Sequence, residues 1–207
     1  MRYIYMLKNY FTIALILLLA SCSRLEKVEL TEDFGERVVY TRSKKDFAKE
    51  GKFSRFDQNG KKIEEAHYKN DTLHGQRVLY YPSGQIETEE FYERGIFHGS
   101  FKNYFEDGQL KQEGQYQNGA MEGEWKSYYA NQQLKESVQF ENNNENGPFK
   151  EYHPNGQLKA EGSYLGGDFE HGPLMLYNES GQLIKKMDCQ KGICRTTWSL
   201  EAENEKQ

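Results

Sequence analysis

The strongest constraint on the fold of this chain is a glycine that recurs at a fixed spacing. The glycines are Gly51, Gly75, Gly99, Gly123 and Gly147, twenty-four positions apart, and Gly172 follows after twenty-five. A fixed period of this length is the signature of a repeat protein, in which each unit buries its surface against its neighbours. The sequence therefore predicts a linear array of six similar units.

Each repeat contains two turn signals at fixed distances from its glycine. The first set lies about nine positions after the glycine, at Asn59-Gly60, Ser83-Gly84, Asp107-Gly108, Asn131-Gln132, Asn155-Gly156 and Ser180-Gly181. The second set lies nineteen to twenty positions after it, at Asn70-Asp71, Arg94-Gly95, Asn118-Gly119, Asn142-Asn143, Gly166-Gly167 and Lys191-Gly192. Such dipeptides tolerate the positive φ angles that two-residue hairpin turns require.

The segments between these turns are long enough to form one strand each. Two strands in each of six repeats predict about twelve antiparallel strands, which at about 4.8 Å per strand make a sheet nearly 60 Å long. We therefore expect an all-β fold, an elongated single-layer antiparallel sheet of repeated β-hairpins.

Two-residue turns define which side chains should face each other across neighbouring strands. Around the first turns the expected pairs are Tyr81/Ile86, Phe105/Leu110, Tyr129/Leu134, His153/Leu158 and Asn178/Leu183. Around the second turns they are Tyr68/Leu73, Tyr92/Phe97, Tyr116/Met121, Phe140/Glu145 and Tyr164/Phe169. Both sets fall on one face, because side chains alternate along a strand. Phe53, Phe101, Trp125 and Phe149 join this face, whereas Arg77 and Leu174 interrupt the pattern.

The opposite face carries a column of aromatic residues with the same period. Its members are Phe56, Tyr80, Tyr104, Tyr128, Tyr152 and Tyr177. These rings could simply cover the thinner side of the sheet. A row of rings with polar tips is also a suitable contact surface for another protein or a glycan, so the column is a candidate binding stripe.

Composition agrees with a thin sheet and argues against one class of partner. Apolar residues make up only 36% of the chain, whereas aromatic residues make up 14%, too many for a disordered chain. The net charge is −5 and no basic stripe is visible. Nucleic-acid binding needs a basic surface that displaces counterions from phosphate, so we expect no nucleic-acid partner.

The segment 1–21 has the pattern of an export signal. Arg2 and Lys8 precede an apolar run from Phe11 to Ala20, which is too short to span a bilayer. The run ends in Leu19-Ala20-Ser21-Cys22, which resembles a bacterial lipobox. That resemblance implies cleavage before Cys22, lipidation of Cys22 and attachment to a membrane. An ordinary signal peptide followed by a coincidental cysteine is the alternative.

The repeat units themselves resemble a known family. Gly123-Glu124-Trp125-Lys126-Ser127-Tyr128-Tyr129 and Asp107-Gly108-Gln109-Leu110-Lys111 resemble the MORN-repeat variant, and so do their equivalents that begin at Gly147 and Asn155. Chains of this kind are often grouped with the YwqK-type antitoxin family. The resemblance spans about residues 51–194 and implies a β-hairpin array that serves as a binding platform, with no catalytic residues to transfer. The altered turn Asn131-Gln132 and the altered last repeat depart from the pattern.

Cys189 and Cys194 occupy the second-turn pair positions of the last repeat. Partners at such positions have α-carbons about 4.5 Å apart, near the lower end of disulfide geometry. An exported protein meets an oxidising compartment, so we predict a disulfide that clamps the last hairpin. A two-cysteine metal site and a redox pair are the alternatives.

No other group of residues has the spacing of a catalytic or metal site. His74, His98 and His171 each precede a repeat glycine, and this phase explains them without a metal. Neighbouring carboxylates such as Glu64-Glu65 point to opposite faces of a strand. No phosphate loop or nucleophile–base set is present, so we expect no metal, no cofactor and no enzymatic activity.

These observations predict four segments. They are a lipoprotein signal at 1–21; the lipidated cysteine, a polar tether and a cap strand at 22–50; six hairpin repeats with a closing strand at 51–198; and a polar tail at 199–207, with disorder expected from Glu201 to Gln207. The expected function is a lipid-anchored bacterial envelope protein, facing the periplasm or carried by the outer membrane, that acts as a non-catalytic scaffold for a protein or a glycan. An antitoxin or immunity-type protein that neutralises a partner toxin is the alternative.

Overall fold

A computed structural model describes residues 24–32 and 35–205, which form one open antiparallel sheet and a short terminal helix. The sheet has 16 strands. The elements are β1 (Leu25–Thr31), β2 (Arg37–Ser43), β3 (Lys49–Phe56), β4 (Lys62–Lys69), β5 (Thr72–Tyr80), β6 (Ile86–Glu93), β7 (Ile96–Phe97), β8 (Gly99–Tyr104), β9 (Leu110–Gln117), β10 (Ala120–Tyr128), β11 (Leu134–Glu141), β12 (Asn144–Tyr152), β13 (Leu158–Tyr164), β14 (Gly172–Tyr177), β15 (Leu183–Gln190), β16 (Ile193–Ser199) and α1 (Leu200–Asn204).

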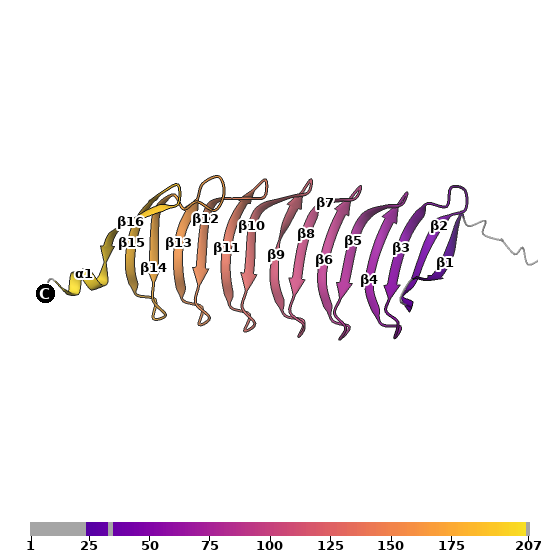
Figure 1. The fold of residues 1–207 in the computed structure, drawn as a ribbon, viewed down its shortest axis with the longest axis horizontal. Helices are drawn as coiled ribbons and strands as arrows, with labels where there is room; N and C mark the ends of the chain where they lie inside the picture. Colours follow the sequence, from indigo (N-terminus) through magenta and orange to yellow (C-terminus); the bar gives the residue numbers. More distant parts are fainter. Residues whose placement is uncertain (1–23, 33–34, 206–207) are drawn as a thin grey trace, which may run out of the picture.

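The strands follow one another across the sheet in sequence order, so the chain forms an elongated meander with one layer (Figure 1). Strand β7 is a short segment that pairs with β6 immediately before β8. The predicted fold class is confirmed. The strand number exceeds twelve because β1, β2 and β16 extend the sheet beyond the repeats and β7 is separate from β8.

Near both ends of the described residues, the structure has more regular elements than the sequence suggested. The first part of the segment 22–50, where a polar tether was expected, contains β1, which pairs with β2 along its whole length. The polar tail that begins at 199 contains α1. The Ser199 hydroxyl accepts a hydrogen bond from the Ala202 backbone N–H and caps this helix.

The second turns have the predicted two-residue geometry. Both central residues have positive φ, as at Asn70 (49°) and Asp71 (61°), which defines a type I′ turn. The expected pairs Tyr68/Leu73, Tyr92/Phe97, Tyr116/Met121 and Phe140/Glu145 are all formed. The pair Tyr164/Phe169 is wrong, because the extra residue of that repeat lengthens the loop and Tyr164 faces Glu170 instead.

The first turns are one residue longer than predicted. In the turn after β5, the Gly84 N–H donates to the Tyr81 carbonyl and the Tyr81 N–H donates to the Gln85 carbonyl, which is a type I turn followed by a glycine bulge. The partner of Ile86 is therefore Tyr80, not Tyr81, and the other four repeats shift in the same way. Gln132 keeps this geometry without glycine, at a φ of 65°.

The hydrophobic core lies on one side of the sheet, which we call the packed face. All but one of the buried apolar residues described fall on this face, and they are Val38, Phe53, Ala66, Trp125, Val138, Phe149, Ala160 and Cys189; Val78 lies on the other face. Phe53 lies opposite Ala66, and Trp125 and Phe149 both lie opposite Val138. A single row of rings in contact with small residues thus replaces the core of a two-layered protein.

Successive repeats are also joined directly at both edges of the sheet. At the second turns the backbone N–H of Gly95 donates to the carbonyl of Leu73, and the N–H of Gly119 donates to that of Phe97. At the first turns the Tyr81 hydroxyl donates to the carbonyl of Tyr104. These bonds connect units one repeat apart, so the array behaves as one continuous sheet.

Candidate functional site: the face opposite the core

The side of the sheet opposite the core, which we call the tyrosine face, carries the predicted stripe. All six members are partly exposed, and they are Phe56, Tyr80, Tyr104, Tyr128, Tyr152 and Tyr177. They lie at the ends of alternate strands next to the first turns. The structure therefore places the column as predicted, and its role in binding stays a prediction.

Three of the tyrosines are tied to glutamates on the neighbouring strand. The hydroxyl of Tyr104 donates to Glu89 at 2.8 Å, and that of Tyr128 donates to Glu113 at 2.8 Å. Tyr177 makes the same bond to Glu161 at 2.7 Å. These carboxylates hold the three rings in fixed orientations.

Burial and the neighbouring carboxylates also change the acidity of these phenols. Burial raises the pKa of Tyr104 and of Tyr128 to about 12, with further contributions from the hydrogen bonds to Glu89 and Glu113. Both hydroxyls therefore remain protonated donors throughout the physiological range.

The other three members differ because their surroundings differ. The Arg37 guanidinium lies 4.2 Å from the centre of the Phe56 ring. Beside Tyr80, the position that corresponds to Glu89 and Glu113 is occupied by Glu65. This carboxylate is paired with Lys52 and Lys62 instead of the tyrosine. The equivalent position beside Tyr152 is Ser137. The stripe is thus not uniform along the sheet.

A polar groove lies over β9, between Gly99 at the start of β8 and the irregularly paired part of β10. Its volume is about 480 Å³, and its lining includes His98, Gln115, Gln117, Glu122 and Glu124. A smaller hollow of about 240 Å³ adjoins it, with Lys102, Glu113 and Lys126 in its wall. Gln115 and Glu124 line both hollows, so the two form one depression across the tyrosine face.

The groove forms beside Gly123, the glycine that begins the fourth repeat, where two strands are irregularly paired. Strands β9 and β10 lose their regular pairing between Glu122 and Lys126. A Cβ atom built on Gly123 would meet no atom within 4 Å, whereas one on Gly99 would lie 3.3 Å from the Cβ of Phe91. The space beside Gly123 is therefore empty where the preceding repeat is closely packed.

Several polar groups of the groove have no partner among the residues that the structure describes. The side chains of Gln115 and Gln117 make no hydrogen bond there, and Lys102 makes no ion pair. Other groups are already used, since the Glu122 carboxylate accepts a hydrogen bond from the backbone N–H of Asn142. The free amides and the free ammonium group could bind hydroxyl, amide or carboxylate groups of a ligand.

The residues that precede the repeat glycines have a structural role that the sequence did not reveal. His98, Glu122 and Asn146 accept hydrogen bonds from backbone N–H groups in the next second turn, at Asn118, Asn142 and Gly166. Glu50 does the same for Asn70. The regular recurrence of acceptor side chains at this position was the signal that could have predicted these bonds.

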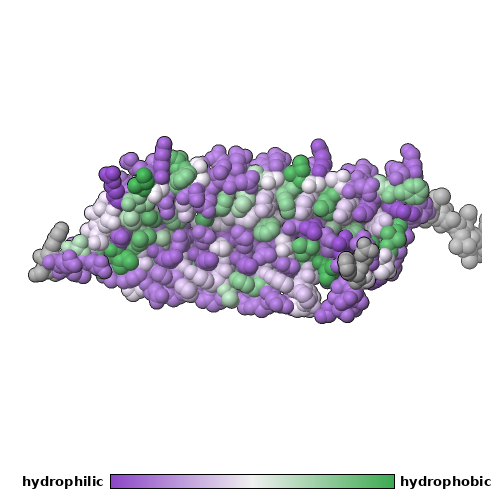
Figure 2. All heavy atoms as spheres, viewed as in Figure 1, coloured by the Kyte–Doolittle hydropathy of each residue, from purple (hydrophilic) through white to green (hydrophobic). Residues whose placement is uncertain are grey.

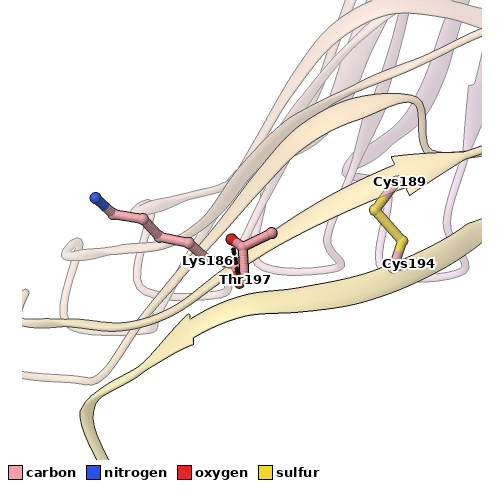
Figure 3. Close-up of a disulfide and its surroundings, with 4 residues drawn as sticks. All are labelled: Lys186, Cys189, Cys194 and Thr197. Atoms are coloured by element: carbon pink, nitrogen blue, oxygen red, sulfur yellow. Dashed lines mark hydrogen bonds between the residues drawn. A yellow bond between two sulfur atoms is a disulfide. The ribbon is translucent and has the colours of Figure 1, made fainter. Parts of the chain in front are cut away.

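The predicted disulfide is formed between Cys189 and Cys194, which face each other on β15 and β16 (Figure 3). Cys189 is buried, at 1% exposure. Further along the same pair of strands, the Thr197 hydroxyl donates to the Lys186 carbonyl at 3.2 Å. The bridge and this bond together fasten the last strand to the sheet.

The described residues show neither a metal-binding cluster nor a membrane-spanning helix. Among residues 24–32 and 35–205, no three His, Cys, Asp or Glu side chains are arranged to hold a metal ion. The same part of the chain has no helix with the length and apolar character needed to cross a bilayer. Cys22, the predicted lipidation site, lies outside the described residues.

The fold and these surfaces define a repeat protein that acts as a scaffold for binding, with one packed face and one polar face. The family model of the MORN repeat variant matches residues 49–70, 73–94, 97–118, 121–142 and 145–165, together just over half of the chain. The chain belongs to this family. Five repeats are matched, and the sixth predicted unit, β14 and β15, follows them with the same hairpin pairing. A search of curated proteins finds no match.

Proposed function

We propose that this chain is a lipid-anchored protein of the bacterial cell envelope whose tyrosine face binds another macromolecule without catalysis. The observation that carries the proposal is the groove over β9, where Lys102, Gln115 and Gln117 have no partner within the described residues. Unpaired polar groups gathered in a depression favour a polar ligand, and a sheet of this length favours an extended one.

The surface around the groove supports a large rather than a small ligand. The one face of the molecule that Figure 2 shows is mostly hydrophilic, with hydrophobic residues in separate patches. The groove is open, and the fixed rings of Tyr104 and Tyr128 lie on the same face. Rigid aromatic rings beside polar groups suit a protein segment or a glycan chain that follows the sheet.

Two features support the location in the envelope. The sequence Leu19-Ala20-Ser21-Cys22 resembles a lipobox, and the Cys189–Cys194 disulfide suits an oxidising compartment. Replacement of Cys22 by Ala should abolish lipid labelling and release the protein from membranes. Unchanged fractionation would show that Cys22 is not the anchor.

The binding role can be tested with a photo-crosslinking amino acid placed at Gln115. In intact cells this probe should yield one crosslinked product that is weakened by the substitution Lys102→Ala. The matched control is the same probe at Gln58, an exposed glutamine in the turn between β3 and β4. Equal products from both positions, or none from Gln115, would contradict a binding site in the groove.

A toxin-neutralising role is the second candidate, and it rests on the resemblance to the YwqK-type antitoxin family. It predicts a neighbouring gene whose product kills cells that lack this protein. Co-expression should restore growth, and Lys102→Ala or Gln115→Ala should reduce the protection. A glycan ligand in the crosslinking experiment would favour the scaffold instead.

A further inference from the structure

The loop between β2 and β3 lies at the corner of the sheet where the described chain begins. The backbone N–H of Lys44, in this loop, donates to the carbonyl of Arg24 at 3.0 Å, and Leu25 pairs with Ser43. Arg24 is only two residues after Cys22 in the sequence, and two residues of chain can span at most about 7 Å. Any lipid on Cys22 would therefore place this loop at the surface of the bilayer.

The loop presents an aromatic ring to solvent in an unusual backbone conformation. Phe47 is 61% exposed and has a φ of 62°, a region that bulky residues rarely adopt. Its N–H donates to the Ser43 carbonyl and closes the loop. The Arg42 guanidinium lies 4.9 Å from the centre of the ring. The backbone thus holds an apolar side chain where nothing else in the described chain buries it.

The charges around Phe47 differ in sign from those of the chain as a whole. Arg24, Lys44 and Lys45 are exposed and make no ion pair within the described part of the chain. Asp46 is the one acidic residue of the loop, and its carboxylate accepts a hydrogen bond from the Ala48 N–H. The chain carries a net charge of −5, so this tip is a basic spot on an acidic protein.

The other end of the sheet provides a contrast. Phe169 is also exposed, at 50%, but it lies between Asp168 and Glu170. An exposed ring between acidic groups would be repelled by an anionic surface. A ring between basic groups would be drawn to one, because each Lys or Arg near such a surface contributes about 1 kcal/mol.

We propose that the β2–β3 loop is a second membrane contact, which seats Phe47 in the interface of a bilayer and Lys44 and Lys45 against anionic lipid headgroups. The proposal rests on the lipid anchor at Cys22, since that anchor brings the loop to the membrane. An acyl chain combined with a basic patch is a known route to stable attachment. The sheet would then extend from the bilayer with its first strands fixed beside the anchor and the groove about 30 Å further along.

The first test measures electrostatic binding without the anchor. The mature chain with Cys22→Ala is sedimented with vesicles of phosphatidylethanolamine and phosphatidylglycerol, and with vesicles of phosphatidylcholine alone. We expect binding only to the anionic vesicles, weakened about 30-fold by Lys44→Gln with Lys45→Gln. The control pair Lys135→Gln with Lys150→Gln removes the same charge from exposed lysines far from the loop and should have little effect. Equal losses from both pairs, or no binding, would overturn the proposal.

The second test locates the ring in the lipidated protein. Tryptophan is placed at Phe47 or, as the control, at Phe169, and quenching by brominated lipids is measured in vesicles. The substitution Phe47→Trp should add strong quenching, whereas Phe169→Trp should add none. No added quenching at position 47 in a membrane-bound protein would overturn the loop contact and leave the anchor intact. Absence of lipid on Cys22 would instead show up as failed lipid labelling.

Discussion

Two regions of the packed face fill the same position of the repeat with different kinds of side chain. Around Trp125 the row is aromatic, with ring centres of Tyr116 and Phe101 at 5.1 and 5.5 Å. Around Arg77 it is ionic, with the Arg77 Nε 2.7 Å from a Glu64 oxygen and the Nη1 3.1 Å from a Glu90 oxygen. Both side chains occupy the same position of the repeat.

The neighbours on the adjacent strands decide which kind of side chain this position can hold. The Trp125 ring lies directly over Gly114 of the preceding strand β9, where a Cβ atom would be 2.2 Å from the ring. Arg77 faces Ala66 on the preceding strand β4 and Glu90 on the following strand β6, and Glu90 also accepts a hydrogen bond from the Tyr92 hydroxyl. Burial opposes the charge of Arg77, but the hydrogen bonds and charges of Glu64 and Glu90 outweigh it and raise the Arg77 pKa. The glycine beside Trp125 thus leaves room for a ring, whereas the carboxylates beside Arg77 favour a cation.

The largest expected effect is the loss of the buried indole. Trp125 is 4% exposed, so Trp125→Ala should lower the free energy of unfolding by about 3–5 kcal/mol. Arg77→Ala should cost less, about 1–3 kcal/mol, because it leaves the buried carboxylate of Glu90 without its cation but removes a side chain that is 26% exposed. Urea unfolding of both variants checks the order, and equal losses would remove the energetic distinction between the two regions.

The second-largest expected loss of stability comes from adding a single methyl group beneath a ring. Gly114→Ala should destabilise the protein by about 1–3 kcal/mol, because the new Cβ overlaps the Trp125 ring. Gly162→Ala is the matched variant, with a Cβ at 2.9 Å from Phe149, and it should cost less. Thermal unfolding measures both, and a larger loss at Gly162 would contradict the close contact at Gly114.

The third prediction converts the ionic region into an aromatic one. Arg77→Phe alone should be destabilising, since it leaves Glu64 and Glu90 without their cation. Addition of Glu90→Gly recreates the arrangement of Phe101 opposite Gly114 and should recover about 1 kcal/mol or more. A double-mutant cycle measures this coupling. If the two substitutions have additive effects on the free energy of unfolding, the residue at position 90 does not determine which side chain is stable at position 77.

The smallest expected effect concerns the phenol beside Glu90. Burial raises the pKa of Tyr92 to about 12, and the hydrogen bond to Glu90 and its charge contribute further. Because the folded-state value lies above the unfolded one, this contribution to stability is present below pH 10 and is lost between about pH 10 and 12. Glu90→Gln should lower the Tyr92 pKa, which ultraviolet titration against a Tyr92→Phe reference measures. An unchanged titration would contradict the hydrogen bond.

Much of the fold could be predicted because its signals are local. The type I′ turns follow from residues such as Asn70-Asp71, whose side chains tolerate positive φ, and the Cys189–Cys194 bridge follows from their places beside such a turn. The first turns were predicted one residue too short, because Ser83-Gly84 fits both a two-residue turn and a three-residue turn with a glycine bulge.

The candidate site was predictable only in part. The tyrosine column could be read from its period, but its bonds to Glu89 and Glu113 run diagonally between strands and depend on the bulged register. The groove depends on the empty space beside Gly123, which a linear pattern does not show. Phe47 has no repeat phase, and nothing in its sequence context marks it as exposed.

The sequence alone determined the period, the order of the strands, the second turns and the covalent clamp at the last hairpin. Each of these depends on the φ angles of single residues or on spacing along the chain. The tertiary structure decided where the surface has a groove, which carboxylates bind the tyrosines and which loop lies beside the first described residues. These depend on contacts between residues 15 to 24 positions apart, whose alignment is set by bulges and the register of the whole sheet.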